Sequence, residues 1–325
     1  MRPLSRTFAA IGTAALTATL VAGPASAKPA ITLTAGGLPR GADVSVPHVD
    51  GDGHTIVDGT IRVKVDAPQV SLLGRSGTAY VVGTSSKQGG HGRIWRVTAG
   101  GARTLLAKAP PYQTILADDG GTIVASRVGR TLRTTITAYD AATGAEKAHK
   151  AFRDYATALD ARNDQVLVGS LEKTLLWTVG TGATALVSRD GGYIGDLSSD
   201  VVSTFTKDPY DGGCAEVRRI STGERLWRSC TEQVAAFNAD ASRIATIGIL
   251  SDGPGPGRVD ARTISGQHVG RYQVRSGWFG TIRFESSTAL LLEVNAARKA
   301  FTARCTGTTC ERASDLRPAQ TLRSS

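Results

Sequence analysis

Short apolar runs followed by polar turns recur along most of this chain. Six aligned segments begin such runs at intervals of 38 to 45 residues: Gln69–Leu73, Tyr112–Leu116, Tyr155–Leu159, Tyr193–Leu197, Gln233–Phe237 and Trp278–Ile282. A polar turn and a second β-rich run follow most of them, as where Asp119-Gly120 precedes Ile123-Val124-Ala125. This pattern indicates a strand, a hairpin and another strand.

A third run comes next and often ends at a glycine-containing turn before a fourth. Ile136–Tyr139 before Thr143-Gly144 is one example. Four antiparallel strands in a period of about 40 residues are typical of one β-propeller blade. We therefore predict an all-β fold, a β-propeller of six four-stranded blades, or of seven if an N-terminal hairpin supplies another.

The chain divides into four parts. Residues 1–27 combine Arg2 and Arg6 with an uncharged run and the small-residue site Ala25-Ser26-Ala27, which is the pattern of a secretory signal peptide. Residues 28–68 form an N-terminal extension with the hairpin sequence TIVDGTIRVKV, which could close the ring. We assign residues 69–313 to the propeller and residues 314–325 to a disordered C-terminal tail.

Charge and export restrict the partners. No stretch after the signal is long and apolar enough to span a bilayer, so we expect a secreted, extracellular monomer. The net charge of +10 falls to +8 when Arg2 and Arg6 are removed, which favours an anionic partner such as an acidic envelope polymer, or another protein. The alternative is a basic surface that is only solvated. Nucleic acid is disfavoured because clustered Lys and Arg with interleaved aromatics do not occur.

Four cysteines allow three pairings in an oxidising compartment. Cys214 and Cys230 lie symmetrically about Thr222, and Cys305 and Cys310 flank the equivalent turn of the last unit. Facing positions on antiparallel strands suit a disulfide. We predict the bonds Cys214–Cys230 and Cys305–Cys310. The alternative, a metal site, lacks a C-x-x-C pair, and we expect neither a metal nor a cofactor.

Two resemblances follow from these turns. Thr222, Gly223 and Trp227 match the quinoprotein-type propeller repeat, roughly Asp-x-x-Thr-Gly-x-x-x-Trp, with Arg219 in the Asp place. That resemblance implies a tryptophan that docks neighbouring blades rather than quinone chemistry. By its period and hairpin pattern, the mature chain resembles exported bacterial WD40-like or TolB-like propellers, which implies a binding scaffold.

A binding site is expected where loops gather on one face of the propeller. The starts of the first strands carry aromatic residues, and the loops between second and third strands are basic. The candidate ligand-binding residues are Tyr112, Tyr155, Tyr193, Trp278, Arg127, Arg130, Lys207 and Arg258. Basic loops around aromatic rings suit an anionic or sugar-like polymer, through charge and stacking. The alternative is that the aromatics wedge between blades.

No catalytic residues stand out. The five histidines show no paired spacing, and no G-x-S-x-G sequence occurs. We therefore expect a secreted, non-catalytic binding or scaffold propeller. The alternative is a propeller enzyme that acts on glycans as a hydrolase or lyase, and Asp196 or Glu172 pointing towards the axis would favour it.

Overall fold

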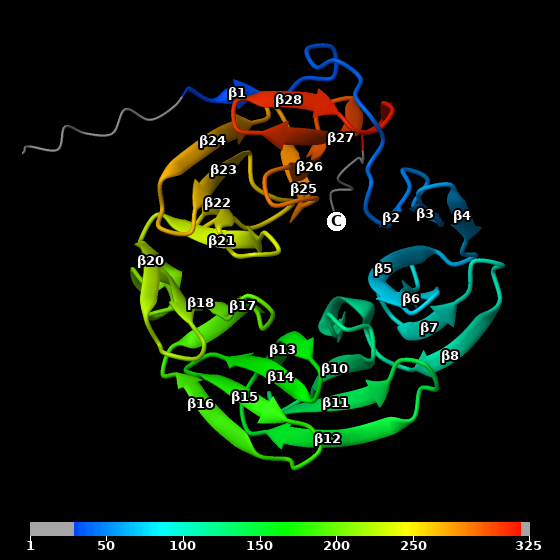
Figure 1. The fold of residues 1–325 in the computed structure, drawn as a ribbon, viewed down its shortest axis with the longest axis vertical. Coiled ribbons are helices and arrows are strands. Elements are labelled where there is room, and N and C mark those ends of the chain that lie inside the picture. Colours follow the sequence, from blue (N-terminus) through cyan, green and yellow to red (C-terminus); the bar gives the residue numbers. More distant parts are fainter. Residues whose placement is uncertain (1–28, 320–325) are drawn as a thin grey trace, which may run out of the picture.

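A computed structural model describes residues 29–319 of the protein. Seven β-sheets stand side by side around a central axis (Figure 1). The fold is an all-β propeller of seven blades, so the N-terminal hairpin does supply a blade beyond the six predicted from the repeat. The predicted signal peptide and the last six residues of the predicted tail lie outside the described residues.

Each blade is one antiparallel sheet. The N-terminal blade contains β2 (His48–Val49), β3 (Thr55–Asp58) and β4 (Ile61–Lys64). The next two contain β5 (Gln69–Ser76), β6 (Ala79–Ser85), β7 (Arg93–Val97), β8 (Arg103–Ala107), β9 (Thr114–Leu116), β10 (Thr122–Val128), β11 (Thr134–Asp140) and β12 (Glu146–Phe152). Two more contain β13 (Ala156–Arg162), β14 (Gln165–Ser170), β15 (Thr174–Thr178), β16 (Thr184–Ser188), β17 (Gly191–Asp196), β18 (Val201–Phe205), β19 (Ala215–Arg219) and β20 (Arg225–Ser229). The last two contain β21 (Glu232–Phe237), β22 (Arg243–Gly248), β23 (Arg258–Thr263), β24 (His268–Gln273), β25 (Trp278–Phe284), β26 (Leu290–Asn295), β27 (Lys299–Thr306) and β28 (Thr309–Arg312).

Burial explains the hydrophobic pattern of the strands. Residues 79–84 of β6 are all buried, because a second strand is covered by a neighbouring blade on each side. The fourth strand β12 alternates between exposed and partly buried positions, since it lies at the outer rim. The outer strand β12 thus keeps an exposed face that the second strand β6 lacks.

The turn between β19 and β20 joins the third and fourth strands of its blade. Gly223 has a φ of 72°, a conformation that favours glycine, and its N–H donates to Arg219 O at 3.0 Å. Trp227 on β20 is buried and packs against the corresponding turn of the next blade, where a Cβ on Gly266 would lie 2.7 Å from the indole. The tryptophan thus packs one blade against its neighbour, as the resemblance implied.

Both predicted disulfides are confirmed. Cys214 and Cys230 lie directly before β19 and after β20, with Cα atoms 4.0 Å apart. Cys305 and Cys310 face each other across β27 and β28 with a Cα separation of 4.2 Å. Each bond closes a hairpin within one blade, and the structure describes no free cysteine.

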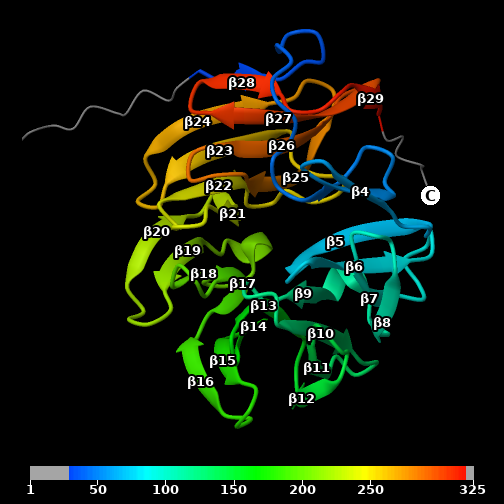
Figure 2. The ribbon, with the colours of Figure 1, turned by 45° about the vertical axis from the view of Figure 1, so that its right-hand side comes forward.

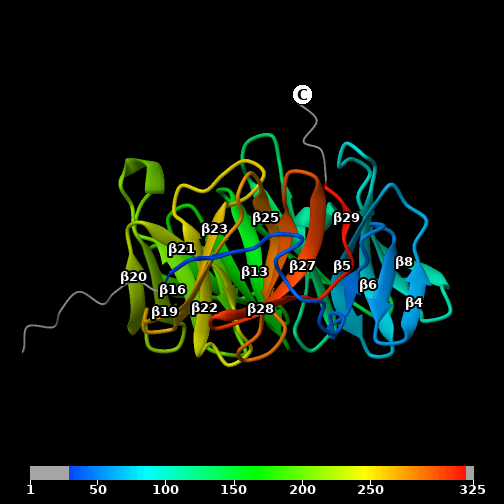
Figure 3. The ribbon, with the colours of Figure 1, turned by 90° about the horizontal axis from the view of Figure 1, so that it is seen from above.

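The two ends of the described segment, residues 29–319, pair with strands of the last two blades. Strand β1 (Ile31–Thr32) adds to β24 in parallel, and the N-terminal segment then crosses the outer side of β27 and β28 (Figure 3). Arg304 fixes this segment, since its guanidinium binds Glu285 and donates to Ala42 O at 3.0 Å and Asp43 O at 2.8 Å. Within the stretch assigned to a tail, β29 (Arg317–Pro318) pairs with β27, where Arg317 also binds Glu293.

Candidate functional site

The first strands of six blades, β5, β9, β13, β17, β21 and β25, have the same position in their sheets and so run in one direction through the ring. Their starts and the loops between second and third strands therefore share one face, here called the front face. Their ends and the turns between third and fourth strands share the opposite, back face. The predicted binding residues are on the front face.

Tyr112 is the most exposed of the four predicted aromatics, with 77% of its surface accessible. It lies in the short 3-10 helix η1 (Pro111–Gln113), not in a strand, because Pro111 begins a turn just before β9. With Gln69, Gly83 and Gly89 it lines a hollow of about 540 Å³, here called the Tyr112 pocket. Tyr155, directly before β13, is 38% exposed. Both rings are available at the surface.

Tyr193 and Trp278 are placed differently. The Tyr193 ring stacks on Phe205 with centroids 4.1 Å apart, and its hydroxyl accepts a 2.9 Å bond from Val234 N of the next blade. Burial raises the pKa of Tyr193 to about 12. Trp278 begins β25, is partly buried, and lies against Gly255. These rings pack within and between blades, which is the alternative weighed for the aromatic set.

The basic residues also fall into two groups. Arg127, Arg130 and Lys207 are exposed and form no ion pair with any described carboxylate. Arg127 donates only to Lys108 O, at 2.9 Å. Arg258 instead binds Asp260 at 3.0 Å and lies 3.8 Å from Glu232, two carboxylates that the blade buries. Its charge is therefore compensated within the fold.

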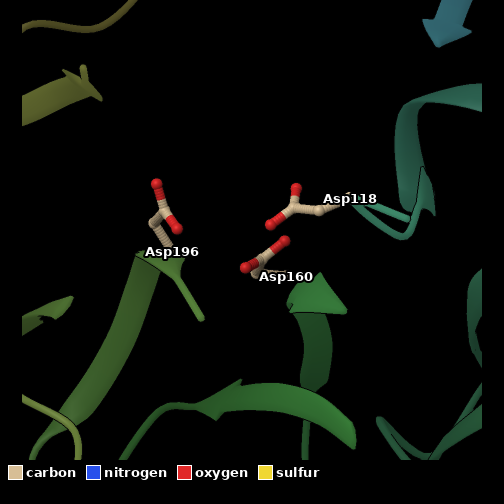
Figure 4. A group of neighbouring side chains, drawn as sticks. All are labelled: Asp118, Asp160 and Asp196. Carbon is tan, nitrogen blue, oxygen red and sulfur yellow. The ribbon is translucent and has the colours of Figure 1, made fainter. Parts of the chain in front are cut away.

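Three aspartates converge on the back face, from three consecutive blades. Asp118 follows β9, Asp160 lies near the end of β13, and Asp196 ends β17 (Figure 4). One carboxylate oxygen of each lies within 4.8 Å of those of the other two. A bulge in β13 between Ala158 and Asp160 shifts the strand register just before the aspartate. Bulges often re-aim a side chain in this way.

The hydrogen bonds of this cluster come only from neutral groups. Leu197 N donates to Asp160 at 2.6 Å, Ser199 N donates to Asp196 at 2.9 Å, and Ser198 Oγ donates to Asp118. No described cation forms an ion pair with any of the three carboxylates. Burial, with the negative charges of Asp118 and Asp196, raises the pKa of Asp160 to about 7. The raised pKa means that Asp160 takes up a proton more readily than an isolated carboxyl group, which lowers the repulsion among the three side chains.

The back-face arrangement limits the chemistry available. Oxygen-only donors at this spacing could hold a hard cation such as Ca²⁺. Aligning the repeats did not reveal the group, because the three aspartates lie six, five and three residues after the starts of their aligned segments. Asp196 was singled out, and it does meet the other two; the structure gives Glu172 no place in this cluster.

Comparisons with known proteins support the architecture. No family model matches the chain, and no curated protein matches it. Hsv2 of Kluyveromyces lactis is 14% identical, with a TM-score of 0.54 over 86% of this chain and 95% of that one. A chain in a crystal structure of the mitotic checkpoint complex is 11% identical, with a TM-score of 0.55 over 75% and 79%.

A third similar structure is longer than this protein. The acylaminoacyl peptidase of Pyrococcus horikoshii is 10% identical and has a TM-score of 0.58 over 80% of this chain and 47% of that one. The chain thus spans about half the length of that peptidase. Identities this low establish the propeller fold alone. Among residues 29–319, no helix has the length and apolarity needed to cross a membrane.

Proposed function

We propose that the protein is a secreted, non-catalytic binding module that holds an anionic polymer of the cell envelope or extracellular space on its front face. The observation that carries the proposal is the group of exposed cations without ion-pair partners, Arg127, Arg130 and Lys207, on the face that also presents Tyr112. This group is here called the front-face cations.

The physical reason is that these charges are not already paired within the fold. Arg262, by contrast, pairs with Glu232 at 2.7 Å. The front-face cations have no such partner, so an anionic ligand can gain their full attraction without breaking an internal contact. Several weak contacts along one polymer add through effective concentration. The Tyr112 pocket offers a ring on which a sugar can stack.

The fold is compatible with this role. Propellers present a broad rigid face, and a neighbour in fold is part of a mitotic checkpoint complex, which is an assembly of proteins. An interaction role comes to this chain only by analogy. A polymer is the better fit because the exposed charge is carried by two blades, around the β10–β11 and β18–β19 loops, instead of being concentrated in one cleft.

The test measures binding of the purified full chain to polygalacturonate and to inorganic polyphosphate, with neutral dextran as reference. The triple variant Arg127→Ala, Arg130→Ala, Lys207→Ala should weaken binding to at least one polyanion about tenfold or more, since each contact contributes on the order of 1 kcal/mol. Affinity should fall as salt is raised from 0.05 to 0.2 M.

Arg162→Ala is the matched control. Arg162 ends β13 on the back face, at the other end of the strand that Tyr155 precedes, and it is also exposed. Its removal should leave binding unchanged. Equal binding of dextran and the polyanions, or equal loss in the control, would reject the front-face proposal.

A further inference from the structure

Among residues 29–319, no strand takes the inner position of the N-terminal blade. Its sheet has three strands in the described chain, whereas the other six have at least four. The β2–β3 loop contributes Asp52 and Gly53 to the Tyr112 pocket, beside Gly89 of the β6–β7 loop. Both loops therefore join second and third strands, and β2 occupies the second position of its blade. Nothing in this sheet corresponds to a first strand.

A cavity of about 900 Å³ lies next to this incomplete blade. Its walls come from β25 and β26 of the last blade, from β5 of the blade that follows the N-terminal one, and from the segment around β2. Figure 1 labels β2 between these two blades, and Figure 2 shows the same region after a turn of 45°. Val49, Val70, Leu72 and Leu291 give it apolar walls. We call it the Arg283 cavity. Its volume suits a small molecule.

The carboxylates that line the cavity are already engaged. Asp50 binds Arg62 at 3.0 Å, and Glu293 binds Arg317. Asp52 accepts bonds from His54 N and from Thr55 N, both at 2.8 Å. The two acids at the mouth, Asp43 and Asp315, both bind Arg40. Each of these carboxylates thus has a partner within the fold, with Asp43 and Asp315 sharing one arginine and Asp52 held by backbone N–H groups.

Among the described arginines that line the cavity, Arg283 has no carboxylate partner. It projects from β25 into the cavity wall, and among the described residues its guanidinium makes one hydrogen bond, to Pro47 O at 3.2 Å, and no ion pair. Burial lowers the pKa of Arg283, opposed by the charge of Glu285, which is itself held by Arg304 and Ser45. A partly buried guanidinium with most of its donors free can bind a hydrogen-bond acceptor that enters the cavity.

We propose that the Arg283 cavity binds a small organic carboxylate, whose anionic group pairs with Arg283 while its hydrocarbon body lies against Val49, Leu72 and Leu291. The site goes beyond the polymer-binding role, because none of the front-face cations lines it. A planar guanidinium binds a carboxylate through two parallel hydrogen bonds, which selects this head group over an alcohol.

The experiment titrates the full chain with octanoate. Two comparison ligands are used: 1-octanol, which has the same hydrocarbon chain without the charge, and acetate, which has the carboxylate without a long hydrocarbon chain. Calorimetry and thermal melting should show that octanoate binds more tightly than either. Arg283→Gln should weaken octanoate binding about tenfold or more, and Arg283→Lys should restore part of it. Arg298→Gln, an exposed arginine in the β26–β27 loop, should behave as the native chain.

A cavity-filling variant separates binding from folding. Thr281→Trp keeps Arg283 but places an indole in the same cavity, at a position that is exposed, so it should block octanoate without unfolding the protein. Octanoate that binds Arg283→Gln or Thr281→Trp as well as the native chain would overturn the proposal. So would octanol binding as tightly as octanoate, or no octanoate binding to the native chain.

Discussion

The front and back faces of this propeller are built from opposite ends of the same inner strands, yet one carries the front-face cations and the other the three aspartates. At the start of β13 Tyr155 is exposed near the basic loops, and near its end Asp160 meets Asp118 and Asp196. The strand between them is buried core that tolerates little change. Strand ends and loops lie outside that core, so the two faces can differ without altering the packing of the blades.

Residues within the front face also differ from one another in their roles. Tyr112 and Tyr193 occupy aligned positions in the sequence repeat, but Tyr112 is exposed in η1, whereas Tyr193 lies within β17, stacks on Phe205 and bonds Val234 of the next blade. Tyrosines at aligned sequence positions thus lie on the surface in one blade and in the packing of another. Stability measurements on the two tyrosines separate these roles.

The largest expected effect concerns this pair. Tyr193→Ala removes a stacked ring and the acceptor for Val234 N, and should lower the free energy of unfolding by about 3 to 5 kcal/mol. Tyr112→Ala, at an exposed position, should change it by less than about 0.5 kcal/mol. Chemical denaturation of both variants gives the two values. Equal losses would mean that Tyr112 is also a packing residue and would remove it from the proposed polymer site.

The next effect concerns the back face. The pKa of Asp160 is about 7 in the folded protein against 3.8 for the free side chain, so the folded state binds the proton more tightly. Stability contributed by this group is therefore lost as pH rises from about 4 to 7. Asp160→Asn cannot ionise, and its amide oxygen can still accept from Leu197 N. It should unfold with about 1 to 3 kcal/mol more stability than the native chain at pH 8.

The measurement compares denaturation of the two proteins from pH 4 to pH 8, in buffers containing a chelator. The difference between them should shrink as the pH falls towards 4, where Asp160 is protonated in the folded state and begins to be protonated in the unfolded state. A constant difference across the range would show that Asp160 does not titrate there. If added Ca²⁺ stabilises the native chain at pH 8 but not the variant, the three aspartates bind the cation.

The fold could be predicted from sequence because its signals are local and repeated. The blade period and glycine turns such as that at Gly223 require no knowledge of distant contacts, and the Cys214–Cys230 pair follows from the turn it flanks. The N-terminal blade was harder to assign, because it has three strands and one of them, His48–Val49, is too short to leave a pattern.

The candidate sites depend on geometry that spacing does not encode. Bulges and loop lengths decide that Asp118, Asp160 and Asp196 converge, so their alignment by repeat fails. Arg258 looked like its exposed neighbours in sequence, but the buried Asp260 on the same strand takes up its charge. Arg283 gave no signal, because whether an arginine meets a carboxylate depends on contacts between strands that spacing does not encode.

The smallest expected effect tests whether the two faces act independently. Strand β13 has seven residues, which at about 3.3 Å each separate its ends by roughly 20 Å. Charges are screened over about 8 Å at 0.15 M salt. The double variant Asp118→Asn, Asp196→Asn should therefore change polyanion affinity less than about twofold under these conditions, and should strengthen it more at 0.01 M salt, where screening extends to about 30 Å. A tenfold gain at 0.15 M would instead place bound polymer within reach of the back-face carboxylates, because screened repulsion from the far end cannot produce a change of that size.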